Sequence, residues 1–208
     1  VFVAITGYET DGHKYIGKAI ELGASAIVLE HVPEGGISVP YIRVASSRRA
    51  LAQMAANYFN HPADSMTMVG ITGTNGKTTT TYLLKTILEA QGHTVGLIGT
   101  NQNMIGDEIL PTERTTPESF ELHKLFAQMR DAGCTHVIME VSSHSLVLDR
   151  VYGIEFTVGA FTNLTQDHLD FHKTMEAYRD AKALLFHQSK TGVTNLDDAA
   201  GKFMLEQK

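Results

Sequence analysis

The sequence predicts an α/β protein with two units: a small N-terminal unit over residues 1–63 and a central unit over residues 64–208, built on a mostly parallel sheet covered by helices. Three observations support this prediction. Short strand-like apolar runs alternate with helix-forming segments. Pro62 interrupts the alternation, because proline disfavours helix at the preceding residue. A glycine-rich turn then joins an apolar strand to a helix.

In the N-terminal unit, apolar and β-branched runs predict strands over residues 2–5, 26–29 and 41–44. Segments 15–22 and 47–60 have the composition and apolar spacing of helices. The residues from His61 to Asp64 predict a short linker into the central unit.

In the central unit, strands are expected over residues 66–72, 95–98, 136–141 and 158–161, and helices over 77–91, 118–132 and 175–186. An irregular stretch is expected up to Pro117, and a weak strand and helix at the end of the chain. Continuous apolar runs such as Val137-Ile138-Met139 are typical of strands covered on both faces. Right-handed crossovers through the helices then give a doubly wound parallel sheet.

The composition limits the class of protein. A hydrophobic fraction of 43% with 19% charged residues is ordinary for a globular chain. The net charge of −6 and the lack of a Lys/Arg cluster argue against nucleic acid as a partner. The single Cys134 cannot form an internal disulfide and fits a reducing compartment. No apolar run reaches the ~18 residues of a membrane span, so a cytoplasmic protein without a membrane partner is expected.

The run from Gly70 to Thr79 (GITGTNGKTT) is typical of a phosphate-binding loop. Small residues let backbone amides face an anion, and the following helix directs the positive end of its dipole toward it. Lys77 can reach the β- and γ-phosphates, and Thr78 is placed for Mg²⁺. Ile71 occupies the position where the usual pattern has its first glycine, so this loop is a variant. The candidate nucleotide-binding residues are Gly73, Thr74, Asn75, Gly76, Lys77, Thr78 and Thr79.

Two further motifs follow strand ends. Glu140 closes a predicted strand, where a hard carboxylate ligand could hold Mg²⁺; a helix cap or a surface charge is the alternative. The stretch 163–172 (NLTQDHLDFH) concentrates carboxylates and imidazoles. Its His168 and His172 are four residues apart, so on a helix they could bind zinc, whereas in a loop one of them could orient a metal-bound phosphate. A solvated polar loop remains the ordinary alternative. Since ligands bind beyond the carboxyl ends of parallel strands, all three motifs are expected to share one cleft.

Other charged residues carry weaker signals. Lys182 lies on an amphipathic helix, and the pattern alone indicates a solvated helix charge. The run from Arg114 to Pro117 (RTTP) and the pair Asp149-Arg150 supply hydroxyl and guanidinium groups suited to an anionic substrate. A turn before a helix and a surface ion pair are the alternatives. Four histidines show no partner pattern and are interpreted as structural or exposed, namely His31, His93, His123 and His136.

Taken together, the motifs resemble the Mur ligases of peptidoglycan synthesis. The residues that carry the resemblance are 70–80 (GITGTNGKTTT), 114–117 (RTTP), 140–144 (EVSSH), 163–172 (NLTQDHLDFH) and 178–186 (YRDAKALLF). Residues 2–5 and 7–13 are similar to the UDP-binding first domain of the enzyme that adds the third stem-peptide residue. The resemblance therefore covers nearly the whole chain.

The resemblance implies an ATP- and Mg²⁺-dependent carboxylate–amine ligase. It would join a diamino acid, lysine or diaminopimelate, to UDP-N-acetylmuramoyl-L-alanyl-D-glutamate through an acyl phosphate, as a monomer. Residues 1–63 would bind the UDP-substrate and residues 64–208 would bind ATP. Family members of this type have a further C-terminal domain and an N-terminal Asp-Ser-Arg segment, both expected to be absent here, so the fragment is expected to be inactive alone.

The resemblance also implies residue roles. Lys77 would stabilise the transferring phosphoryl group, and Thr78 would bind one Mg²⁺. Glu140 and His168 would hold a second Mg²⁺, together with Lys182 once CO₂ has carbamylated it. The residues implied in substrate binding are Tyr8, Glu9, Thr10, Thr115, Thr116, Ser142 and Arg150; some relatives carry Gln where Leu148 stands.

Three alternative functions stay open. A folylpolyglutamate-type amide ligase would share the phosphate loop but lack the UDP-sugar unit. A non-catalytic nucleotide-binding or switch protein would use the loop without ligation. A zinc hydrolase would be built on residues 167–172.

Overall fold

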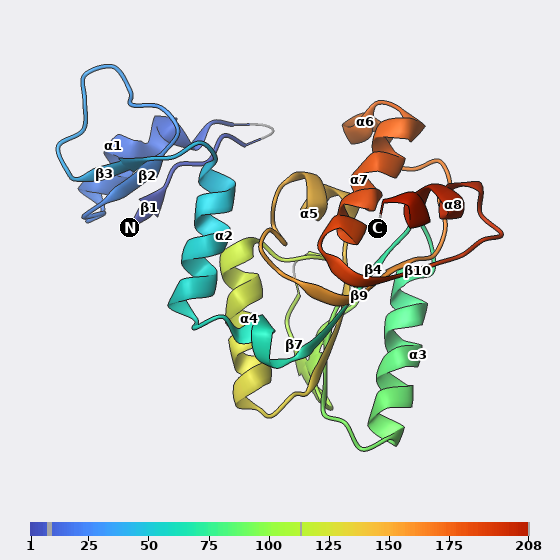
Figure 1. The fold of residues 1–208 in the computed structure, drawn as a ribbon. Helices are drawn as coiled ribbons and strands as arrows, with labels where there is room; N and C mark the ends of the chain where they lie inside the picture. Colours follow the sequence, from blue (N-terminus) through green and yellow to red (C-terminus); the bar gives the residue numbers. More distant parts are fainter. Residues whose placement is uncertain (8–9, 113, 208) are drawn as a thin grey trace.

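A computed structural model describes residues 1–7, 10–112 and 114–207 and contains two separate sheets. In the N-terminal unit, β1 (Phe2–Val3), β2 (Ile27–Leu29) and β3 (Tyr41–Arg43) form a parallel sheet in that order, and it projects from the rest of the chain in Figure 1. The 3₁₀ helix η1 (Gly12–Tyr15) leads into α1 (Ile16–Glu21). A small apolar cluster of Ala4, Ile16, Ile27 and Leu29 holds this unit together.

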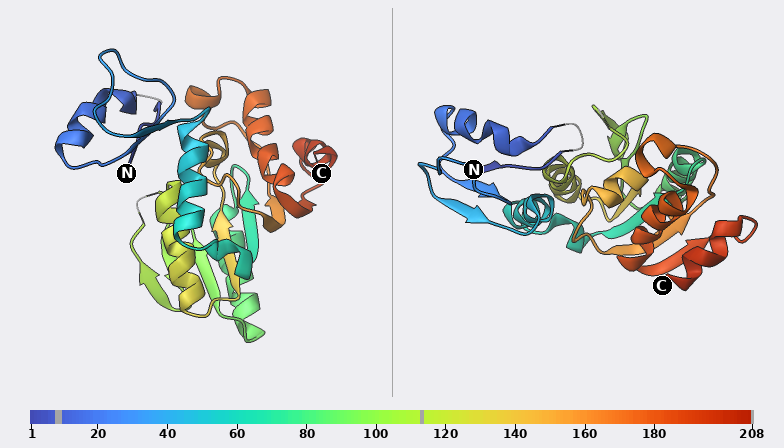
Figure 2. Two further views of the ribbon diagram at one scale, coloured as in Figure 1. Left: turned by 60° about the vertical axis from the view of Figure 1, so that its left-hand side comes forward. Right: turned by 90° about the horizontal axis from the view of Figure 1, so that it is seen from above.

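The helix α2 (Ser47–Tyr58) connects the two units and packs beside α4 (Ser119–Asp131) of the central unit (Figure 2). After its C-cap at Phe59, Asn60 and His61 both lie in the left-handed region and lead into η2 (Pro62–Ser65). Pro62 and Ala63 are buried, and Arg130 of α4 donates to the carbonyl oxygen of Phe59 at 3.0 Å. The expected linker is therefore a packed turn rather than a free connection.

The central sheet has the strand order β10-β9-β4-β8-β5-β6-β7. Its bounds are β4 (Thr67–Thr72), β5 (Val95–Ile98), β6 (Asn103–Ile105), β7 (Glu108–Leu110), β8 (His136–Glu140), β9 (Phe156–Phe161) and β10 (Ser189–Thr194). All pairs are parallel except those of β6 and β7. The expectation of an irregular stretch up to Pro117 is wrong for residues 103–110. These three-residue strands, joined at the left-handed Gly106, are too short for apolar periodicity to predict.

Helices cover both faces of this sheet (Figures 1 and 2), which confirms the expected architecture. On one face, α3 (Lys77–Ala90) packs Leu84 and Leu88 against Ile71 and Ile138. On the other face, α4 (Ser119–Asp131) and α7 (Met175–His187) enclose a larger core. The helix α8 (Ala199–Glu206) packs on β10. Within the described ranges, no helix has both the length and the apolar character needed to cross a membrane.

The strand order positions the candidate site. β4 lies between β8 and β9, with Ile71 paired to Glu140 and Thr72 paired to Phe161. Because all three strands are parallel, the segments that follow them leave the same edge of the sheet. The short helices α5 (Ser143–Val147) and α6 (Leu169–His172), which were not predicted, lie in two of these segments. The three sequence motifs are therefore brought to one end of the sheet.

Candidate active site

The loop after β4 depends on glycine at two positions. Gly73 has φ +145°, and a Cβ atom there would collide with the Thr162 side chain. Gly76 has φ +82° and forms the N-cap of α3. An L-residue rarely adopts either conformation. The backbone can therefore approach an anion closely in front of the α3 N-terminus, where the positive end of the helix dipole lies.

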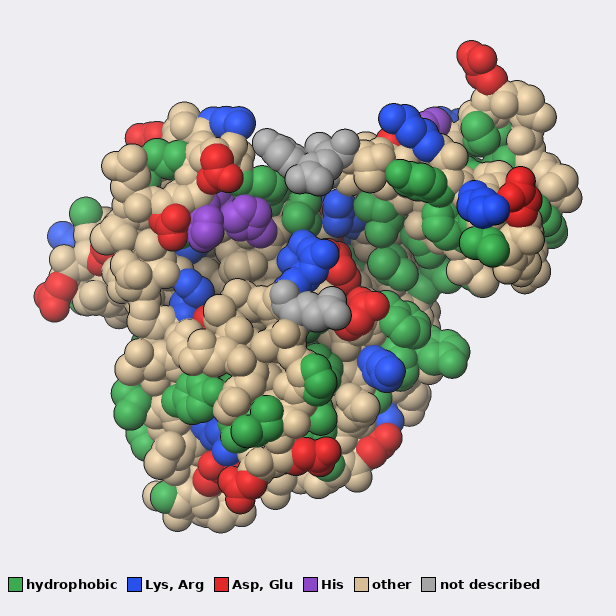
Figure 3. All heavy atoms as spheres, turned by 180° about the vertical axis from the view of Figure 1, so that it is seen from behind, with side chains coloured by type: hydrophobic (Ala, Val, Ile, Leu, Met, Phe, Trp, Pro, Cys, Tyr) green, Lys and Arg blue, Asp and Glu red, His purple; other side chains and the backbone are tan. Residues whose placement is uncertain are grey.

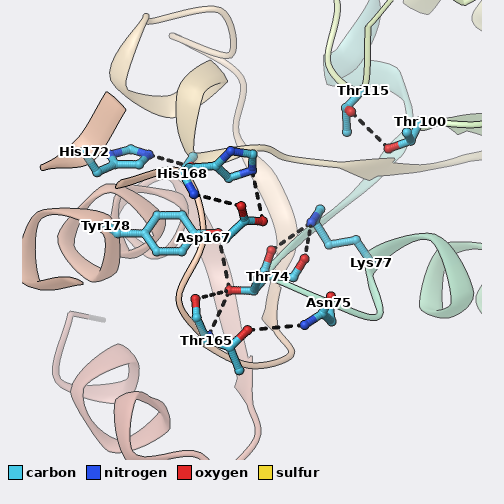
Figure 4. Close-up of polar contacts among 12 residues, drawn as sticks. Thr74, Asn75, Lys77, Thr100, Thr115, Thr165, Asp167, His168, His172 and Tyr178 are labelled. Atoms are coloured by element: carbon cyan, nitrogen blue, oxygen red, sulfur yellow. Dashed lines mark hydrogen bonds and ion pairs between the residues drawn. The ribbon is translucent and has the colours of Figure 1, made fainter. Parts of the chain in front are cut away.

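Asn163 and Thr165, from the segment after β9, hold this loop in place. Figure 4 shows Thr165 beside Thr74 and Asn75. The Thr74 amide donates to the Asn163 carbonyl at 2.9 Å, and the Asn75 amide donates to Asn163 Oδ1 at 3.0 Å. The Thr165 amide donates to Thr74 Oγ1 at 3.0 Å. Two of the amides expected to face phosphate are thus engaged with Asn163, whereas Thr79, in the first turn of α3, is exposed.

The Lys77 ammonium lies in the mouth of the loop. Its Nζ donates to the carbonyl oxygens of Gly73 and Thr74, each at 2.9 Å. Burial lowers the pKa of Lys77, while the carboxylates of Glu140 and Asp167 act in the opposite direction. The loop therefore contains a partly desolvated cation whose hydrogen bonds, within the described part of the chain, go to two backbone carbonyls.

Glu140 is 1% exposed, so its carboxylate is neither a surface charge nor the cap of an exposed helix. Its Oε1 accepts from Thr78 Oγ1 at 2.9 Å and from the Thr100 amide at 3.0 Å, and its Oε2 accepts from Thr100 Oγ1 at 3.0 Å. A Cβ atom at Gly99 would lie 2.5 Å from Oε1. A buried carboxylate beside a threonine hydroxyl is a hard oxygen donor set, which fits Mg²⁺.

His168 and His172 do not share a face, so the structure does not form the helical zinc pair. His168 precedes α6 in the left-handed region (φ 52°), and its half-exposed ring lies 3.5 Å from Asp167. His172 is buried, and its Nε2 lies 2.8 Å from Ser143 Oγ. Burial, with the nearby His144, lowers the pKa of His172 to about 4, so this imidazole is neutral. Of the two, only His168 is presented toward the loop, as Figure 4 shows.

Lys182 is 1% exposed, so the expectation of a solvated helix charge is wrong. Its Nζ lies 4.2 Å from the centre of the Tyr178 ring. Burial, together with the charge of Lys77, lowers the pKa of Lys182 to about 7, while Asp167 opposes the shift. The burial arises because Lys182 lies on the buried stripe of α7 with Tyr178, Ala181 and Leu185.

The residues predicted for substrate binding lie in two places. Thr10 belongs to the N-terminal unit, and the central unit contains the others that the structure describes, namely Thr115, Thr116, Ser142 and Arg150. Thr116 Oγ1 donates to the Glu140 carbonyl at 2.9 Å and accepts from the Ser142 amide at 3.2 Å, while Ser142 caps α5. Arg150 pairs with Glu118 at 2.8 Å, and its buried Nε has no partner among the described residues. Thr115 is half-buried, with its hydroxyl 3.0 Å from Thr100 Oγ1. Thr10 is exposed in a turn beside Gly7, whereas Tyr8 and Glu9 lie outside the described residues.

Sequence reasoning missed a cluster in the N-terminal unit. His31, expected to lack a partner, stacks on His13 at 3.8 Å, and both imidazoles lie near Asp11. These three residues present ligand atoms close enough for a metal ion. However, His13 Nδ1 lies 2.7 Å from Asp11 Oδ1, and its Nε2 accepts from the Glu30 amide at 3.0 Å. Because both ring nitrogens are engaged, we interpret the cluster as structural; the Asp-x-His spacing was its signal in the sequence.

A glycine-rich loop after the central parallel strand, a lysine in its mouth and a buried carboxylate beside its threonine define a phosphate-loop nucleotide-binding α/β protein. Figure 3 shows acidic, basic and imidazole side chains on the face where the N-terminal unit meets the central unit. Residues 71–208 match the Mur ligase middle domain, and residues 1–59 match the domain described as Mur ligase family, catalytic domain. The chain belongs to the Mur ligase family, which confirms the resemblance.

Individual relatives agree with this assignment. The chain is 54% identical over 210 residues to UDP-N-acetylmuramoyl-L-alanyl-D-glutamate–2,6-diaminopimelate ligase of Clostridium tetani, covering 100% of this chain and 43% of the relative. A solved structure of a ligase of that name is 29% identical and covers 98% of this chain and 42% of its own, with a TM-score of 0.82. MurF ligase from Thermotoga maritima in complex with ADP is 25% identical, with 93% and 42% coverage and a TM-score of 0.58. The chain thus spans less than half the length of these relatives.

Proposed function

We propose that the chain forms the ATP-binding and UDP-substrate-binding part of a ligase that joins diaminopimelate to UDP-N-acetylmuramoyl-L-alanyl-D-glutamate. The observation that carries the proposal is the convergence of Lys77, Thr78 and Glu140 at the mouth of one glycine loop. The sequence left lysine and diaminopimelate open, and the names of the relatives favour diaminopimelate. Residues 1–63 would bind the UDP end of the substrate and residues 64–208 would bind ATP.

On nucleotide binding, Lys77 would exchange its carbonyl contacts for β- and γ-phosphate oxygens, and the first-turn amides of α3 would face the same anion. An ammonium fixed there stabilises charge on the transferring phosphoryl group. Thr78 and Glu140 would hold Mg²⁺, which shields the phosphate charge when it is bound. The D-glutamyl carboxylate would attack the γ-phosphorus and ADP would leave, giving an acyl phosphate. The amine of diaminopimelate would then displace phosphate.

Lys182 would act as a carbamate. With a pKa near 7, about half of this amine is uncharged at neutral pH and can act as a nucleophile. Its nitrogen would form a bond to the carbon of CO₂ and lose a proton, which converts a cation into an anion. That anion, with His168 and Glu140, would hold a second Mg²⁺ near the acceptor carboxylate.

The substrate would lie across the two units. Thr115 offers a half-buried hydroxyl, and Arg150 offers a cation that Glu118 already orients. Thr116 donates to the Glu140 carbonyl and accepts from the Ser142 amide, so these two residues would tie substrate contacts to the metal site. Tyr8, Glu9 and Thr10 remain predictions for the uridine end.

The match of residues 1–59 to the Mur ligase family favours this proposal over a folylpolyglutamate-type ligase, which would lack the UDP-sugar unit. A non-catalytic nucleotide-binding protein would use the same loop, and only ligand measurements separate it from the ligase. The engagement of His172 with Ser143 gives no support to a zinc hydrolase.

Calorimetric and thermal-shift titrations of the chain test the proposal. MgADP and MgATP should bind, and Lys77→Ala should weaken binding at least tenfold. Lys190→Ala, a change to an exposed lysine that pairs with Glu155, should not. UDP-N-acetylmuramoyl-L-alanyl-D-glutamate should raise the melting temperature, and a folate should not. Failure of the wild-type chain to bind nucleotide, or stabilisation by folate alone, would overturn the assignment.

A further inference from the structure

The segment that carries His168 cannot hold its own position. The helix α6 has only four residues, and it lies between His168 (φ 52°) and Lys173 (φ 69°), both in the left-handed region. Residues other than glycine rarely adopt that conformation, and a single helical turn is not stable by itself. The position of His168 must therefore be set by contacts with the rest of the fold.

His172 provides one of these contacts. It is the buried residue of α6, and its Nε2 lies 2.8 Å from the Oγ of Ser143, which is 2% exposed. Ser143 begins α5, three residues after Glu140. The hydrogen bond therefore ties the His168 segment to the turn that follows the buried carboxylate. Since both groups are removed from water, losing either partner would leave the other unsatisfied.

Tyr178 provides the second contact. Its ring is 1% exposed and lies 4.9 Å from the His172 ring and 6.0 Å from the His168 ring, between centroids. Its hydroxyl lies 3.3 Å from Thr74 Oγ1 in the phosphate loop. Figure 4 shows the Tyr178 ring between the loop and the two imidazoles. One buried aromatic ring thus joins the phosphate loop to the His168 segment.

The backbone of His168 bonds to the Asp167 carboxylate and to the amides of Phe171 and His172, so what remains to be fixed is the direction of its ring. Its ring meets the rings of Tyr178 and His144 edge-to-face, the latter at 4.9 Å, and makes a 3.5 Å contact with Asp167. The His144 ring in turn lies 5.4 Å from the His172 ring. Both rings that flank His168 therefore contact His172.

We infer that His172 and Tyr178 are positioning residues that hold His168 in register with the phosphate loop and with Glu140. The inference rests on the proposed function for the role of His168, but the restraint is a property of the free chain. His172 does not act as a ligand, because its Nε2 is engaged with Ser143. A purely structural role would predict lost stability without any effect on the His168 ring.

Matched serine variants test this inference. Ser143→Ala removes the partner of His172. Ser145→Ala removes an equally buried hydroxyl from the same helix, which donates to the Ser142 carbonyl at 2.6 Å. NMR of the imidazole groups should show the His168 ring signals displaced and broadened in Ser143→Ala and unchanged in Ser145→Ala. Tyr178→Phe, which keeps the ring and removes the contact with Thr74, should also displace the His168 signals.

A second measurement uses Mg²⁺ and a non-hydrolysable ATP analogue. The Mg²⁺ concentration that half-saturates analogue binding should rise about fivefold in Ser143→Ala and stay constant in Ser145→Ala. His172→Gln, whose amide nitrogen reaches about as far as Nε2, should recover most of the loss seen in His172→Leu. Equal effects of the two serine variants on the His168 ring would overturn the inference. Absence of analogue binding by the wild-type chain would instead reject the proposed function, and the ring signals would still decide the inference.

Discussion

Replacing Lys182 by Met should stabilise the chain while removing the group proposed to bind CO₂. Lys182 is a long side chain that is 1% exposed, and no carboxylate pairs with it directly among the described residues. A methionine fills a similar volume without a charge. The wild-type residue therefore carries a desolvation cost that the variant avoids.

The magnitude follows from the pKa of Lys182, which burial lowers from 10.5 to about 7. The unfolded chain binds this proton more tightly than the folded chain, so stability rises with pH between about 7 and 10.5. At about 1.4 kcal/mol per unit, the cost is about 4 kcal/mol at pH 7 and about 2 kcal/mol at pH 9. The contact of Nζ with the Tyr178 ring offsets up to about 2 kcal/mol. Lys182→Met should therefore gain about 2 to 4 kcal/mol at pH 7.

The assay is urea unfolding at pH 7 and pH 9, with and without added bicarbonate. The gain of Lys182→Met over wild type should shrink at pH 9, and bicarbonate should stabilise the wild type alone. Lys190→Met, at an exposed lysine, should stay within about 0.5 kcal/mol of wild type. A variant no more stable than wild type at both pH values would refute the reasoning about desolvation. If bicarbonate does not change the stability of the wild type, the proposal that Lys182 is carbamylated is rejected.

Three other outcomes are expected. Gly73→Ala should abolish nucleotide binding, because its Cβ would collide with the Thr162 side chain. Gly17→Ala, whose Cβ meets open space within a helix, should leave binding intact and raise stability by about 0.5 to 1 kcal/mol. Titration of both variants with MgADP checks this. His123 is buried with both ring nitrogens unpartnered among the described residues, and burial lowers its pKa to about 4. The stability that neutral His123 contributes should be lost as pH falls from about 6.5 toward 4, by about 2 kcal/mol at pH 5, and His123→Leu should remove this part of the pH dependence in denaturant titrations. Arg130→Ala should cost about 1 to 2 kcal/mol, because it frees the carbonyl groups at the C-terminus of α2, and the loss should appear as a lower denaturation midpoint.

The elements with strong local signals were predicted well. The strand before the glycine loop and the helix after it were expected at 66–72 and 77–91 and occur at 67–72 and 77–90. The hairpin at 103–110 and the helices α5 and α6 were missed because each contains too few residues for a hydrophobic period to form.

In the candidate site, likewise, the residues with a local sequence signal were predicted and their tertiary partners were not. The motif residues Lys77, Thr78 and Glu140 could be selected because their types and spacing express phosphate and metal chemistry locally. The partners that hold them could not be selected. Thr100 was not distinguished from other threonines, and it became part of the site only because β5 lies beside β8.

The sequence by itself determined the phosphate loop, the alternation of strands and helices, and the resemblance to the Mur ligases, since all three are expressed in short contiguous runs. Only the tertiary structure decided that Lys182 is buried beside Tyr178, that Glu140 meets the Thr78 hydroxyl, and that the His172 imidazole bonds to Ser143. The physical reason is that desolvation and buried hydrogen bonds depend on which strands and helices become neighbours, and that order is set by the packing of the whole sheet.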